Sequence, residues 1–85
     1  MSDEQLQRTA AVLEAMDESF LAHKRGDKAA FHAAVERAIE IDDDVAVAVR
    51  GGTMFGMIPN PETDYYAWRA YVDHAVSAAA VDRAL

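Results

Sequence analysis

Residues 20–44 read FLAHKRGDKAAFHAAVERAIEIDDD and decide the fold, because they end one helix, turn and begin another. Lys24 and Arg25 suit the negative C-terminal end of a helix, and Gly26 suits the position just after it. Asp27 follows directly as an N-cap for the next helix. Since so short a connection makes the two helices run antiparallel, the sequence predicts a helical hairpin.

Upstream of this turn, apolar side chains recur at steps of three and four residues, as on one face of an amphipathic helix. Ser2 and Gln5 have the spacing of a capping box, and acidic residues follow Ser2 where the positive end of the helix dipole favours them. The sequence therefore predicts a helix over about 3–25. Its inner stripe consists of Leu6, Thr9, Ala10, Leu13, Met16, Asp17 and Phe20.

The helix that follows the turn stops at three consecutive aspartates. Asp42, Asp43 and Asp44 are unfavourable at the C-terminus of a helix dipole and favourable at an N-terminus. We therefore predict that they end a helix over 28–42 and start another one. They do not form a calcium loop, which needs acids alternating over about twelve residues with a glycine at the sixth. The inner face of this second helix consists of Phe31, Ala34, Val35, Ala38, Ile39 and Ile41.

The segment 45–58, VAVAVRGGTMFGMI, is compatible with two structures. Alternating valines, a Gly51-Gly52 pair and a second apolar run are typical of a β-hairpin. A lone hairpin needs a further strand or a helix to be stable, and the sequence offers no other strand. We therefore predict a helix over 44–58, in which Gly52 and Gly56 would let another helix approach closely. A β-hairpin at 45–58 is the alternative.

The last helix is predicted over 61–83. Asn60 is a cap residue and Pro61 suits the first helical position. Its inner face consists of Tyr65, Trp68, Val72, Ala75, Val76 and Ala79. The fold class is therefore all-α, a small bundle of three to four helices in a single domain over 1–85.

The composition limits both the core and the possible functions. The chain has 85 residues, of which 52% are hydrophobic, but 18 of these are alanine, so the core is expected to be thin and closely packed. The absence of cysteine excludes a disulfide scaffold, a thiolate zinc site and a cysteine nucleophile. A small scaffold with so thin a core is often completed by oligomerisation, which predicts a homodimer.

The net charge of −7 argues against direct binding of nucleic acid or of anionic membrane surfaces. The acidic N-terminus is unlike a signal peptide, and no apolar run is long enough to span a membrane. These features predict a cytoplasmic protein.

No residue pattern in the sequence predicts catalysis or a bound cofactor. His32 and Glu36 have a spacing that can supply two metal ligands, but only His23 is available as a third. Asp73, His74 and Ser77 have the residue types of a nucleophilic triad, but on one helix His74 points away from the other two. We therefore expect no enzyme, no metal and no cofactor.

Two groups of side chains are candidates for contact with a partner protein. Tyr66, Arg69 and Tyr71 fall outside the predicted inner face of the last helix, and Tyr and Arg are common in binding hot spots. Met54, Phe55 and Met57 form a second apolar group, and methionines adapt to irregular binding surfaces. The sequence thus favours a non-enzymatic protein–protein interaction module that self-associates.

The alternative function is an acidic inhibitor or antagonist, of the kind found among phage inhibitors and antitoxins, that binds a basic protein surface. The acidic surface would consist of Glu14, Asp17, Glu18, Glu36, Glu40, Asp42, Asp43 and Asp44. A metal- or ligand-binding helical protein, with an apolar pocket near 54–58, is a further alternative.

Overall fold

The computed structural model describes residues 3–84, which form three helices and, over that range, no strand. The helices are α1 (Asp3–Lys24), α2 (Lys28–Met54) and α3 (Tyr65–Ala84). The all-α prediction is confirmed, and the β-hairpin at 45–58 is wrong. None of the three helices is long and apolar enough to cross a membrane. Ser2 of the expected capping box lies outside the described residues.

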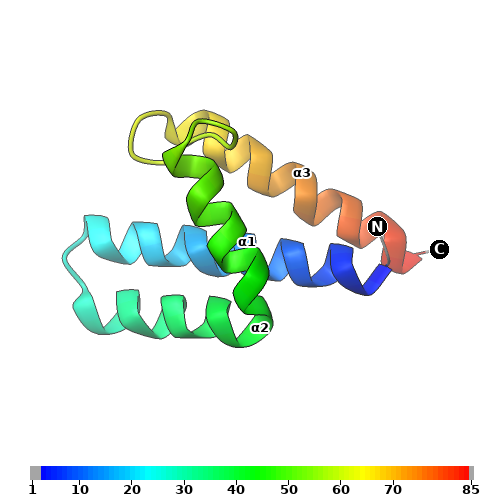
Figure 1. Cartoon of the computed structure of the whole chain (residues 1–85), viewed down its shortest axis with the longest axis horizontal. Coiled ribbons are helices and arrows are strands. Elements are labelled where there is room, and N and C mark those ends of the chain that lie inside the picture. Colours follow the sequence, from blue (N-terminus) through cyan, green and yellow to red (C-terminus); the bar gives the residue numbers. More distant parts are fainter. Residues whose placement is uncertain (1–2, 85) are drawn as a thin grey trace.

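The α1–α2 turn forms as the sequence predicts. Gly26 has a positive φ of 78°, a conformation that glycine adopts without a steric penalty. Its N–H donates to the carbonyl of His23, and the Asp27 N–H donates to the carbonyl of Ala22, which is a Schellman ending. The Asp27 side chain then accepts from the Ala30 N–H and caps α2. The two helices therefore pack side by side and antiparallel (Figure 1).

Helix α2 bends sharply at Asp42, whose backbone is extended with φ −165° and ψ 103°. The Asp42 carboxylate accepts a hydrogen bond from the Val45 N–H at 3.2 Å, as an N-cap does. Its other oxygen lies 3.2 Å from the Arg8 guanidinium of α1, which holds the bend in place. The stop and start predicted at the three aspartates is confirmed. After the bend, the second half of α2 crosses α1 towards the start of α3 (Figure 1).

The second half of α2 ends at Met54, so the predicted end at 58 is wrong. Gly56 has a φ of 79° and reverses the chain, and the N–H groups of Met57 and Ile58 both donate to the Gly52 carbonyl. A Cβ at Gly52 would lie 2.6 Å from Ile58 Cδ1. Gly52 therefore allows the returning loop to approach closely. The sequence pattern predicts another helix in this place.

Helix α3 starts at Tyr65, four residues later than predicted, because Asp64 is its cap. The Asp64 carboxylate accepts from the Ala67 N–H at 3.0 Å. Asn60 instead closes a separate turn, in which its side chain accepts from Glu62 and its carbonyl accepts from Thr63 and Asp64. Asn60 and Asp64 are both possible N-caps, and the helix starts later than predicted because Asp64 is the one that caps it.

The core lies on two sides of α1, the central helix of the bundle (Figure 1). On one side, Val12 and Ala15 pack against Ala38 and Ala46 of α2, where the small side chains allow close approach. On the other side, a cluster joins all three helices and consists of Leu13, Val49, Trp68 and Val72. Near the N-terminal end of α1, the Gln7 amide donates to the Ala79 carbonyl of α3 at 2.7 Å. Helix α1 is therefore the element on which both other helices depend.

Candidate binding surfaces

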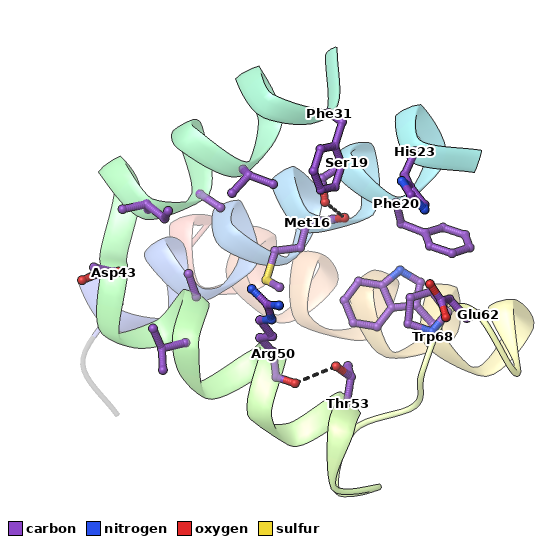
Figure 2. Close-up of a pocket in the computed structure, with 16 residues that line it drawn as sticks. Met16, Ser19, Phe20, His23, Phe31, Asp43, Arg50, Thr53, Glu62 and Trp68 are labelled. Carbon is purple, nitrogen blue, oxygen red and sulfur yellow. Dashed lines mark hydrogen bonds between the residues drawn. The ribbon is translucent and has the colours of Figure 1, made fainter. Parts of the chain in front are cut away.

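The bend of α2 opens an apolar groove of about 330 Å³ between its two halves and α1. Figure 2 shows its lining, to which α1 contributes Met16 and Phe20 and α3 contributes Trp68. Ile39 before the bend and Val47 after it line the groove and are exposed. A straight α2 could not form this concave surface, so the groove is a consequence of the break at Asp42.

Four ionisable side chains also line this groove, which we call the bend groove. The Arg50 side chain reaches across it towards Met16, while Asp43 and Glu62 lie on opposite sides of the view (Figure 2). His23 is at the far end of α1 and packs against Phe31, with the ring centroids 5.5 Å apart. The bend groove therefore combines an apolar lining with one exposed guanidinium that lines it.

A second candidate surface is the apolar tip, which consists of Met54, Phe55 and Met57. These side chains are 67%, 80% and 77% exposed. They are left uncovered because Gly56 reverses the chain immediately after α2. Met54 and Met57 also line a shallow depression with Ala67 of α3. The three tip residues predicted for partner contact are thus all exposed.

Asp17 is a buried polar side chain, only 5% exposed. Its carboxylate accepts hydrogen bonds from the Tyr65 hydroxyl at 3.1 Å, from Trp68 Nε1 at 2.9 Å and from the Arg69 guanidinium at 2.9 Å. All three donors belong to α3. Asp17 is therefore an internal anchor between α1 and α3, and its assignment to the acidic surface is wrong.

The sequence indicates that Arg69 is available to a partner. The structure instead holds it in this anchor. In addition to Asp17, it pairs with Glu14 at 3.0 Å and with Asp73 at 2.7 Å. Hydrogen bonding to Asp73 and the carboxylates of α1 together raise the pKa of the guanidinium, so it stays charged. Of the other two residues predicted on this helix, Tyr66 is 87% exposed and Tyr71 is also exposed. The sequence pattern does not predict this anchor. The signal that could have revealed it is Asp17, an acidic residue in the apolar stripe of α1.

Alkaline pH is expected to weaken this anchor through Tyr65. Burial and the Asp17 carboxylate raise the pKa of its phenol. Because the folded pKa lies above the ordinary value of about 10, the contribution of the neutral phenol is complete below that value. It is lost as the pH rises through the folded pKa. The free energy of unfolding, measured with urea at about pH 8 and about pH 11, should therefore fall more in the wild type than in Tyr65→Phe. Equal losses in the two proteins would contradict this.

The remaining acidic residues divide into paired and unpaired groups. Glu18 pairs with Arg37 of α2, Glu14 with Arg69, and Asp42 with Arg8. Within residues 3–84, no group of three side chains could hold a metal ion, and this includes the surroundings of His32. Of the residues predicted to form the acidic surface, Glu36, Glu40, Asp43 and Asp44 are exposed and form no ion pair with another described residue.

No family model, curated protein or solved structure matches this chain.

Proposed function

We propose that the protein is a non-enzymatic interaction module that self-associates through the apolar tip. The observation that carries this proposal is the high exposure of Met54, Phe55 and Met57, three large apolar side chains within four residues of the chain. Large apolar side chains that gather on a surface commonly mark a protein–protein contact. The thin, alanine-rich core supports the same conclusion, since association would bury further large side chains.

The energy of such a contact is of the same order as the cost of association. Fully burying a Phe or Met side chain contributes about 1.5–3 kcal/mol. A two-fold contact would bury three such side chains from each copy, and this total is to be set against an association cost of about 4–15 kcal/mol. We therefore expect a dimer with a dissociation constant in the micromolar range. Since each copy carries a charge of −7, added salt should strengthen the dimer by screening their repulsion.

Substituting Phe55→Asp is expected to shift the dimer towards monomer, raising the dissociation constant at least tenfold because the charge would have to be desolvated in the contact. Sedimentation equilibrium over a concentration series measures this. Val81→Asp is the matched control, because Val81 is also exposed but lies near the other end of α3. A wild-type protein that stays monomeric at several hundred micromolar, or equal weakening by both variants, would refute self-association through the tip.

The acidic-inhibitor function remains a second candidate, favoured by the unpaired acids Glu36, Glu40, Asp43 and Asp44 along α2. Salt dependence separates the two functions. Binding of a basic protein should weaken steeply as salt rises, whereas self-association through the apolar tip should not.

A further inference from the structure

We propose that the bend groove binds an amphiphilic monocarboxylate, a molecule with an apolar chain or ring and a single carboxylate, and that Arg50 binds the carboxylate. This inference goes beyond the proposed function. It concerns a different set of side chains from the apolar tip, so either proposal can fail without the other.

The size and lining of the bend groove fit the apolar part of such a ligand. Its volume of about 330 Å³ is at the lower end of the range for small-molecule sites, which begins at about 300 Å³. Aromatic rings from three parts of the chain, Phe20, Phe31 and Trp68, line it together with Met16. Trp68 is only 1% exposed, so one wall of the groove is rigidly held in the core.

Arg50 supplies the charge that selects a carboxylate. Among the described residues, Arg8, Arg25, Arg37 and Arg69 form ion pairs within the chain, whereas Arg50 and Arg83 form none. Of these two, Arg50 lines the groove and Arg83 does not. A chain with 15 acidic residues has therefore left unpaired the one guanidinium that reaches across an apolar groove (Figure 2). A guanidinium presents a planar fork of N–H donors that matches a carboxylate in two parallel hydrogen bonds.

The two acids that line the bend groove restrict the ligand further. Asp43 and Glu62 lie on opposite sides of Arg50 in the view, and neither is within ion-pair distance of it (Figure 2). Their negative charge would repel every anionic group on the ligand, and Arg50 can offset this repulsion for one carboxylate only. The groove should therefore prefer one carboxylate on an apolar body to a dicarboxylate or a phosphate monoester.

Titration of the purified protein with decanoate, kept below its micellar concentration, tests the proposal. Trp68 is the only tryptophan in the chain and lines the groove, so its fluorescence reports occupancy. We expect saturable binding of one decanoate per chain, confirmed by isothermal titration calorimetry. Arg50→Leu should weaken binding about tenfold, the scale of a charge-assisted hydrogen bond. Decanol should bind the wild type more weakly than decanoate by a similar factor, because it lacks the charge.

Arg83→Leu is the matched control, because Arg83 is an exposed arginine in the last turn of α3, away from the groove. It should leave decanoate binding unchanged, as should Phe55→Asp at the apolar tip. Circular dichroism should show the same helix content in Arg50→Leu as in the wild type. The proposal is overturned if no saturable binding occurs at millimolar decanoate, or if Arg50→Leu and the wild type bind it equally. Tighter binding of decyltrimethylammonium than of decanoate would also overturn it, by assigning the groove to cations through Asp43 and Glu62.

Discussion

Replacing Asp17 with alanine is expected to lower the free energy of unfolding by about 3–5 kcal/mol, the scale for removing one partner of a buried charge pair. The Asp17 carboxylate is the shared acceptor for three donors on α3, and it is almost fully buried. Without it, the Trp68 indole N–H remains in the core with no acceptor, and Arg69 loses its most buried partner. A folded domain of this size has a total stability of only about 4–13 kcal/mol, so the loss would be a large fraction of the total.

Asp17→Asn should cost less, about 2 kcal/mol, because its amide oxygen still accepts one or two of the three hydrogen bonds. Its amide nitrogen, however, could not replace the carboxylate oxygen that accepts from Arg69, because a guanidinium cannot accept a hydrogen bond. This intermediate variant separates the loss of charge from the loss of the acceptor. If Asp17→Asn cost as much as Asp17→Ala, the charge and not the hydrogen bonds would be the main contribution.

Urea unfolding followed by circular dichroism measures these losses without relying on Trp68, whose surroundings change in the variants. Glu18→Ala is the control, since Glu18 is the next residue of α1 and is an exposed acid that pairs only with Arg37. Exposed ion pairs contribute about 0–1 kcal/mol, so its loss should be small. An Asp17→Ala protein within about 1 kcal/mol of the wild type would show that α3 does not depend on the anchor.

Leu13→Ala is expected to cost about 2–5 kcal/mol, the range observed for truncating a fully buried leucine. Leu13 lies in the cluster that joins α1 to Val49 of α2 and to Trp68 and Val72 of α3. Because this cluster contains side chains of all three helices, the cavity left by truncation cannot be filled by moving one helix alone. The cost should therefore fall in the upper half of the range.

Leu21→Ala is the matched control, because it makes the same chemical change on the same helix at a side chain that is 39% exposed. It should cost about 1 kcal/mol or less, in proportion to the smaller apolar area it buries. Thermal and urea unfolding of both variants measure the difference. Equal losses would indicate that packing does not set the stability of α1. Helix propensity, which both substitutions change in the same way, would then be the cause.

The elements and their ends were largely predictable because they depend on neighbours within a few residues. Gly26 and Asp27 form the first turn through hydrogen bonds that reach no more than five residues along the chain. The break at Asp42 is likewise fixed by a cap on Val45, three residues away. The errors at 58 and 61 have the same local origin: each segment held two possible stop or cap residues, and the sequence pattern did not rank them.

The contacts that place the helices relative to one another were not predictable in this way. Asp17 looked like one more acid of a charged surface, because its donors lie 48 to 52 residues further along the chain. Arg69 looked available to a partner for the same reason. The sequence pattern also does not predict the bend groove. The aspartates predicted a break, but the direction of the bend depends on the Arg8–Asp42 ion pair and on packing across α1.

The sequence by itself therefore determined where the chain is helical, because capping and periodicity act over one or two turns. It also singled out the tip residues Met54, Phe55 and Met57, because they form a compact apolar group in the sequence and methionines adapt to irregular surfaces. Only the tertiary structure decided which charges are internal and which remain free. That distinction depends on whether a partner from a distant helix reaches the charge, as happens at Asp17 and does not happen at Arg50.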